Sequence, residues 1–96
     1  MKARLVIHER MVFDDGAILE IKVWRVPEQV TASRHWLKYS LFYGERGKRL
    51  IGYDNERGKG DHRHTGGHEE QYRFTSVERL LADFRAEVER LRGEPI

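Results

Sequence analysis

Residues 75–93 read TSVERLLADFRAEVERLRG, and this stretch decides the fold. Thr75 followed by Glu78 fits a capping box at a helix start, and Gly93 is a typical helix end. Apolar residues recur between them at spacings of three and four, which places them on one stripe of a helix. They are Val77, Leu80, Leu81, Phe84, Val88 and Leu91. We therefore predict an amphipathic helix over about 76–92.

The apolar stripe needs an apolar surface to cover, and the preceding sequence offers one. Apolar and polar residues alternate over about 3–13, 17–26, 35–43 and 48–54, which is the period of a half-buried strand. In the first of these stretches Leu5, Ile7, Met11 and Phe13 share the predicted buried parity.

Turn signals separate the predicted strands. Asp14-Asp15-Gly16 and Gly44-Glu45-Arg46-Gly47 are short and glycine-bearing, so each joins antiparallel neighbours. Tyr72 and Phe74 share a parity, so 71–74 can add a short fifth strand. The prediction is one α+β domain over 1–96, with a four- to five-stranded antiparallel meander and one C-terminal helix packed on one face.

Composition narrows the class of protein. A chain of 96 residues forms one domain. It contains no cysteine, which excludes disulfides, a thiol nucleophile and thiolate zinc sites. We recognise no apolar run of membrane length and no signal peptide, so we expect a cytoplasmic protein without membrane contact. The net charge of +2 has the sign that suits nucleic acid, but it is small.

The segment 54–70 departs from this pattern because it is polar and glycine-rich. We predict that it is a loop that carries function, since long unstructured loops are uncommon in small domains. Its lysine, Lys59, lies between glycines as in a P-loop, but five residues separate Gly52 from Gly58 where that motif has four, and Gly60 replaces the Ser or Thr. We therefore reject that kind of nucleotide binding.

The same segment holds the parts for cleaving a phosphodiester without metal. Histidine titrates near neutral pH, so His62 and His64 can act as acid and base. Lys59, with Arg57 or Arg63, can stabilise the charge that develops on the phosphate. Asp54 or Asp61 can orient a histidine. We predict catalytic roles for His62, His64, Lys59 and Asp54, and substrate contacts for Arg57, Arg63, Asn55 and Tyr53.

Two other readings of the polar segment stay open. His62, His64 and His68 have spacings that can ligate a metal, but the neighbouring lysine and arginines would repel a cation, so we predict no metal and no cofactor. The segment can also be a surface that binds nucleic acid or an acidic partner without chemistry. His8 and His35 lie on predicted strands, and we expect both to be half-exposed sheet residues.

Several motifs resemble one family of proteins. WRVP at 24–27, YDNERGKGDHRH at 53–64, YRF at 72–74 and LLADF at 80–84 are similar to those of the TumE-type family, and the resemblance runs from about Leu5 to Leu91. Members are toxins of bacterial toxin–antitoxin modules, long known as a domain of unknown function.

The resemblance implies a toxin whose partner is a cognate antitoxin, typically with a DNA-binding domain. Small toxins of this kind are often ribonucleases, so RNA is the expected target by analogy of class. We predict a metal-independent ribonuclease of a type II module. A non-catalytic binding module and a metal-dependent nuclease are the alternatives. Trp24 and Trp36 are candidate antitoxin contacts, and an exposed edge strand would allow a homodimer.

Overall fold

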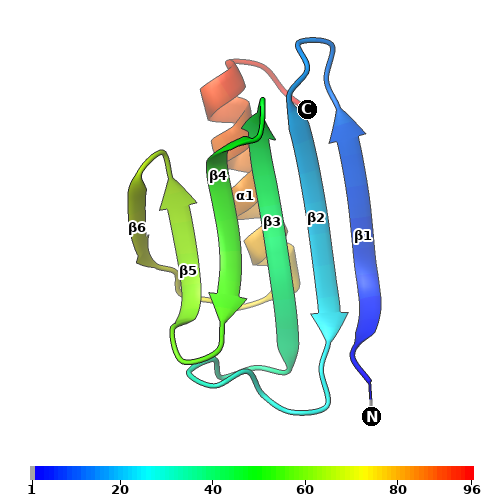
Figure 1. Cartoon of the computed structure of the whole chain (residues 1–96), viewed down its shortest axis with the longest axis vertical. Coiled ribbons are helices and arrows are strands. Elements are labelled where there is room, and N and C mark those ends of the chain that lie inside the picture. Colours follow the sequence, from blue (N-terminus) through cyan, green and yellow to red (C-terminus); the bar gives the residue numbers. More distant parts are fainter. Residues whose placement is uncertain (1) are drawn as a thin grey trace.

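The computed structural model describes residues 2–96 and shows one antiparallel sheet and one helix within them. Each strand pairs with the next strand of the chain, so the sheet is a meander (Figure 1). This arrangement confirms the predicted α+β class and the C-terminal helix. In chain order the elements are β1 (Arg4–Val12), β2 (Ile18–Arg25), β3 (Leu37–Glu45), β4 (Lys48–Glu56), β5 (Gly60–Thr65), β6 (His68–Gln71) and α1 (Val77–Arg92).

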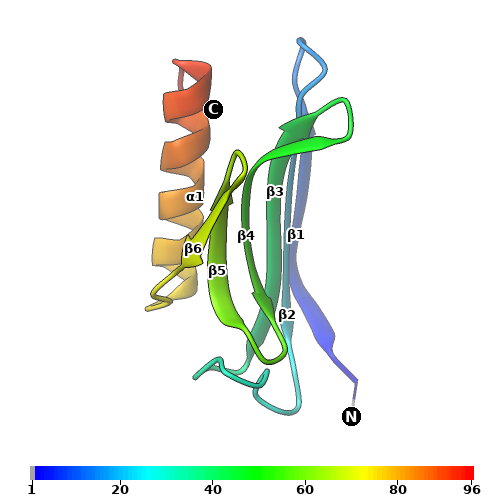
Figure 2. The ribbon, with the colours of Figure 1, turned by 60° about the vertical axis from the view of Figure 1, so that its left-hand side comes forward.

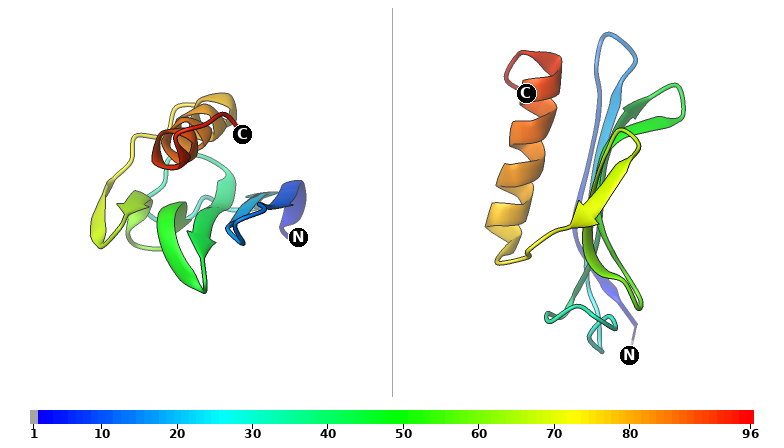
Figure 3. Two further views of the ribbon diagram at one scale, coloured as in Figure 1. Left: turned by 90° about the horizontal axis from the view of Figure 1, so that it is seen from above. Right: turned by 90° about the vertical axis from the view of Figure 1, so that its left-hand side faces the viewer.

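The molecule has two layers. Helix α1 lies along one face of the sheet, and no helix of residues 2–96 covers the other face (Figures 2 and 3). Phe84 of α1 packs edge-to-face on Tyr53 of β4, with ring centroids 5.8 Å apart. The core consists of the alternate residues of β2, β3 and β4 that face α1, together with three helix residues: Leu19, Ile21, Val23, Tyr39, Leu41, Tyr43, Ile51, Tyr53, Leu80, Phe84 and Val88.

The start of α1 differs from the prediction by one residue. Ser76 is the N-cap, with extended backbone angles, and its Oγ accepts a hydrogen bond from the backbone N–H of Arg79 at 3.0 Å. The predicted capping box of Thr75 and Glu78 is therefore wrong. The sequence places two hydroxyl residues side by side, and either satisfies the cap pattern. The αL conformation of Gly93 at the other end confirms the predicted stop.

The apolar stripe of α1 is narrower than predicted. Leu80, Phe84 and Val88 are fully buried, whereas Leu91 is 55 % exposed. The strand β1 also departs from its pattern, because the pairing with β2 shifts register between Leu5 and Ile7. The shift leaves Leu5 51 % exposed instead of on the predicted buried parity.

The main correction concerns residues 54–70, which are not a loop. The strand β4 continues to Glu56, and β5 and β6 follow, so the sheet has six strands instead of the predicted four to five. Glycines with positive φ lie in or beside the two turns, including Gly58 and Gly66. The residues 72–74 predicted within a fifth strand lie outside the sheet, since β6 ends at Gln71.

The strands β5 and β6 escaped prediction because they lack apolar alternation. Both faces of β5 carry polar side chains, so alternate residues do not differ in hydrophobicity and nothing in the sequence marks the strand. Tertiary pairing with β4 satisfies their backbone hydrogen bonds. The segment that bears the predicted site residues is therefore part of the sheet.

The position of the N-cap can be tested by paired hydroxyl removal. Ser76→Ala removes the acceptor for the Arg79 N–H and should lower the free energy of unfolding by about 1 kcal/mol. Thr75→Ala is the matched control and should change it by less than about 0.5 kcal/mol. Urea unfolding measures both. If the Thr75 variant lost more free energy of unfolding than the Ser76 variant, the predicted capping box of Thr75 and Glu78 would be correct.

Candidate active site

The pleat of β5 divides the predicted site residues between the two faces of the sheet. His62 lies opposite Asp54 of β4, and His64 lies opposite Gly52 of β4 and Glu69 of β6. Neighbouring residues of a strand point to opposite faces, so Asp61 and Arg63 point toward the helix side while the histidines point to the open face. We call Asp54, His62, His64 and Glu69 the histidine cluster.

The histidine cluster brings two imidazoles and two carboxylates into contact distance. Nδ1 of His62 lies 3.1 Å from Oε1 of Glu69. His64 lies between both acids, with Nε2 3.6 Å from Oδ1 of Asp54 and Nδ1 3.6 Å from Oε2 of Glu69. The two rings have centroids 6.3 Å apart. Three predicted catalytic residues thus share one site, with Glu69 as a fourth member that was not among the predicted catalytic residues.

Two polar atoms of the histidine cluster are buried without a hydrogen-bond partner. They are Nε2 of His62 and Oδ1 of Asp54, and within residues 2–96 the only other such side-chain atom is Nε of Arg92. A buried polar atom without a partner is costly, and such atoms concentrate where a ligand or a reaction needs them. The cluster is therefore the part of the described chain where unsatisfied polar groups gather.

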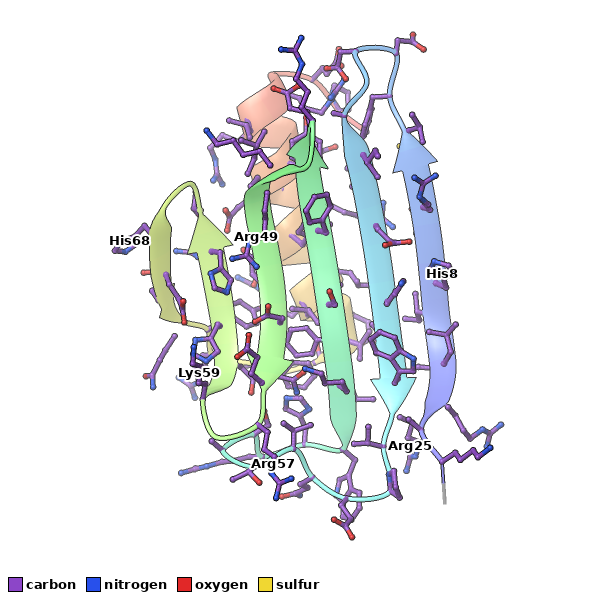
Figure 4. All side chains as sticks on the ribbon, viewed as in Figure 1. His8, Arg25, Arg49, Arg57, Lys59 and His68 are labelled. Atoms are coloured by element: carbon purple, nitrogen blue, oxygen red, sulfur yellow. The ribbon has the colours of Figure 1, made fainter. Side chains whose placement is uncertain are left out.

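Arg49 adds a positive charge that the sequence reading missed. The pairing of β3 with β4 puts Phe42 opposite Gly52, and β5 puts His64 on the other side of that glycine. The Arg49 side chain occupies the space above Gly52, since a Cβ built there would lie 2.6 Å from Cδ of Arg49. Its guanidinium reaches to 3.8 Å from Oδ2 of Asp54. Figure 4 shows Arg49 over β4.

Lys59 and Arg57 do not lie with the histidines. Both belong to the turn between β4 and β5 (Figure 4). Lys59 lines a pocket of about 460 Å³ together with Asp61, and it forms an exposed ion pair at 3.9 Å with Glu56. The structure therefore puts Arg49, and not Lys59, beside Asp54 of the histidine cluster.

Tyr53 and Asn55, which were predicted to contact the substrate, point instead to the helix side of the sheet, where they pack within the fold. Tyr53 is 1 % exposed and donates to Glu87, and Asn55 is 0 % exposed. The Asn55 amide accepts from the Tyr39 N–H and donates to the Leu37 carbonyl, at 2.9 and 2.7 Å. Burial leaves Tyr53 and Asn55 no surface on which to meet a ligand.

Arg63, the fourth predicted contact residue, bridges two acids. Its guanidinium lies 3.0 Å from Glu87 of α1 and also pairs with Glu70 of β6. These ion pairs tie the edge of the sheet to the helix. The guanidinium is thus engaged on the face opposite the histidine cluster.

His35 was expected to be a half-exposed strand residue, and this expectation is wrong. It precedes β3, and only 14 % of its side chain is exposed. Its Nε2 lies 2.7 Å from Asp61, and its Nδ1 accepts from the Leu37 N–H at 3.2 Å. Both ring nitrogens are therefore occupied, which suits a structural role. His8 fits its expectation, with 45 % of its side chain exposed near Glu20.

The Asp61 carboxylate of β5 accepts hydrogen bonds from β3 and from the segment that precedes it. One oxygen accepts from Oγ of Ser33 at 2.6 Å, and the other from Tyr39 OH at 2.8 Å and Nε2 of His35. The carboxylate predicted to orient a histidine of the polar segment instead holds His35. A strand reading of residues 60–65 could have revealed this, because the period of two puts Asp61 and His62 on opposite faces.

Among residues 2–96, no group of three or more His, Cys, Asp or Glu side chains is arranged to hold a metal ion. None of the described helices is both long and apolar enough to cross a membrane.

Fold and cluster together define a small α+β protein that carries a histidine–carboxylate site on an uncovered sheet face. A family model described as Toxin TumE matches residues 2–92. The chain therefore belongs to the TumE toxin family, as its motifs indicated. Membership implies the role of toxin in a toxin–antitoxin system, with an antitoxin as its partner. No curated protein and no solved structure matches the chain significantly.

Three tyrosines on the helix side should resist ionisation. Burial, followed by hydrogen bonds to Asp61, Glu87 and Asp83, raises the pKa of Tyr39, Tyr53 and Tyr72 respectively. A folded pKa above the unfolded value of about 10 stabilises the fold below that pH, and the stabilisation is lost as pH rises further. The free energy of unfolding should therefore fall above about pH 10.

Absorbance of the phenolate group against pH measures this directly. The denatured chain should ionise all its tyrosines near pH 10, whereas the folded chain should retain protonated phenols at that pH. Tyr39→Phe should remove part of the delayed signal. Identical titration curves for the folded and denatured chains would contradict the burial of these groups.

Proposed function

We propose that this TumE-family toxin is a metal-independent ribonuclease whose active site is the histidine cluster with Arg49. The observation that carries the proposal is the pair of buried, unpartnered atoms, Nε2 of His62 and Oδ1 of Asp54, beside a second imidazole. An unpaired buried polar group destabilises the fold, so a reacting group that pairs with these atoms would stabilise the site. A site for acid–base chemistry keeps a nitrogen free for the reacting group.

The chemistry needs a base, an acid and a cation. The base removes the proton from the 2′-OH of RNA, and the acid protonates the leaving 5′ oxygen. With Nδ1 of His62 facing Glu69, its Nε2 is free to accept the proton. His64 would then donate to the leaving oxygen. Each carboxylate lies 3.6 Å from a ring nitrogen of His64, beyond hydrogen-bond distance, so Glu69 would orient the ring at Nδ1 while the Nε2–H turns from Asp54 to the leaving oxygen.

Arg49 would provide the cation in this mechanism. Negative charge grows on the phosphate oxygens during transfer, and a fixed guanidinium stabilises it. The side chain is 43 % exposed above Gly52, so it can contact a phosphate without leaving its position. Side chains above His62 must move to admit the substrate, since Nε2 lies beneath the surface. Catalytic contacts often tighten only when the substrate binds.

Substitution of the histidines tests the acid–base roles. His62→Ala and His64→Ala should each lower the rate of RNA cleavage by about 10²–10⁴-fold and relieve growth arrest. His68→Ala is the matched control, because His68 is exposed at the turn of the same hairpin and opposite Thr65. It should retain activity and toxicity. The parent should show a bell-shaped rate profile with pH.

The same assay separates the competing functions. RNA that binds but returns intact at every pH would identify a binding module, and its affinity would fall steeply with salt. Loss of cleavage after addition of a chelator, with recovery on adding back a divalent metal, would identify a metal-dependent nuclease. Full toxicity of both folded histidine variants would place the site elsewhere.

A paired substitution tests Arg49. Arg49→Ala should lower the cleavage rate about 10²-fold, whereas Lys48→Ala, its neighbour in β4, should leave the rate near that of the parent. Gly52→Ala should act like a weaker Arg49 variant, since its methyl group would occupy the space of the Arg49 side chain. Single-turnover kinetics measure all three. Equal rates for the Arg49 and Lys48 variants would remove Arg49 from the mechanism.

The antitoxin is proposed to cover the open face and block the cluster. Trp24 lies on that face, partly buried, and Trp36 is 49 % exposed near the same end of the sheet. Large aromatic side chains are enriched in protein interfaces. A DNA-binding antitoxin of a bacterial type II module, acting in the cytoplasm, fits this proposal. Pairing of the β1 edges into a homodimer is a further proposal.

A further inference from the structure

A second polar site lies on the helix side of the sheet, apart from the histidine cluster. It is the pocket of about 460 Å³, and three chain segments line it at the end of the sheet where β4 turns into β5. These are 32–35 before β3, 59–61 at the start of β5, and 71–74, which runs from the last residue of β6 toward α1. In Figure 1 the three segments meet at the lower end of the sheet. We call it the basic pocket.

The lining of the basic pocket has a positive charge. Arg34, Lys59 and Arg73 each come from a different segment, and Asp61 is the one acidic lining residue. Among residues 2–96, neither Arg34 nor Arg73 has an ion-pair partner within 4.0 Å, and Lys59 has only the exposed contact with Glu56. Three cations thus face one carboxylate.

The carboxylate of Asp61 offsets one of these three charges, but among residues 2–96 it forms no ion pair with Arg34, Lys59 or Arg73. Its oxygens accept hydrogen bonds from Ser33, His35 and Tyr39 at 2.6–2.8 Å. Those bonds fix the wall of the basic pocket. The pocket is therefore a rigid site whose free donors are guanidinium and ammonium groups.

Backbone packing also builds the pocket. The Gly58 N–H donates to the Thr31 carbonyl at 2.9 Å, and a Cβ at Gly60 would lie 2.9 Å from the Ala32 carbonyl oxygen. Ala32 has φ 78°, which a residue with a side chain rarely adopts. Strain of this kind persists where surrounding contacts hold it, and it clusters at ligand sites.

We infer that the basic pocket binds the phosphate group of a nucleotide. Arginine and lysine donors recognise phosphate, and the pocket volume lies in the range of small-molecule sites, well above that needed for an isolated ion. Phe74, stacked on His35 with centroids 3.9 Å apart, adds an aromatic side chain to the lining. The phosphate can come from a free mononucleotide or from a strand of RNA. The inference goes beyond the proposed ribonuclease function and does not depend on it.

Titration of the folded chain with three probes tests the inference. The probes are inorganic phosphate, 5′-AMP and a short single-stranded 2′-deoxy oligonucleotide, which lacks the nucleophile for cleavage. Amide chemical shifts should move in segments 32–35, 59–61 and 71–74. Arg34→Ala, Lys59→Ala and Arg73→Ala should each weaken binding roughly three- to tenfold. Arg57→Ala is the matched control, because Arg57 shares the turn of Lys59 but does not line the pocket.

The pattern of binding identifies the source of the phosphate. Binding of 5′-AMP with those losses supports a nucleotide site, and binding of the oligonucleotide alone with those losses supports a contact to the nucleic-acid chain. No shift with any probe, or equal binding by the parent and the folded Arg34→Ala/Arg73→Ala double variant, would overturn the inference. 5′-AMP has no phosphodiester bond for the histidine cluster to cleave, so its binding to the basic pocket is measured apart from cleavage, and failure of the ribonuclease proposal would not affect the result.

Discussion

The packing of three helix side chains on one face of the sheet is the contact on which the rest of the structure depends. Leu80, Phe84 and Val88 bury against the inward residues of β2, β3 and β4. Since strand side chains alternate between faces, this contact decides which residues become core and which stay at the open face. Ion pairs at the margin, such as Arg85 with Glu9 at 2.7 Å, join the helix to the outer strands.

The strand β5 shows how one polar segment can serve two faces. Asp61 holds His35, Ser33 and Tyr39 on the helix side, and Arg63 bridges β6 and α1. The residues between and after them, His62 and His64, form the cluster on the other side. A stretch with no apolar residues therefore joins the sheet because its inward side chains form hydrogen bonds and ion pairs instead of a hydrophobic core.

Sequence reasoning succeeded where hydrophobic contrast was strong. The C-terminal helix and its end at Gly93, the first four strands and the meander order followed from periodicity and turns. It failed for β5 and β6, because the residues on both faces of these strands are polar. It also failed for the N-cap, because Thr75 and Ser76 are adjacent hydroxyl residues and either one fits the cap pattern. Three members of the histidine cluster were predicted as neighbours, and β4–β5 pairing brings Asp54 opposite His62.

Two residues outside the polar segment were missed for a different reason. Arg49 joins the cluster because Gly52 leaves space above β4, and His35 meets Asp61 across 26 positions. No local pattern encodes such contacts. They arise only when strands pair in one register.

The sequence alone determined the α+β class, the TumE resemblance and the kinds of chemistry available, since these depend on local periodicity and residue type. Only the tertiary structure decided which groups can act together. The pleat put Asp61 and the histidines on different faces of the sheet, because a period of two sends successive side chains to opposite faces, and the turn before β5 put Lys59 apart from the histidines. The tertiary structure also put Arg49 beside Asp54 of the histidine cluster, because Gly52 leaves space for its side chain over β4.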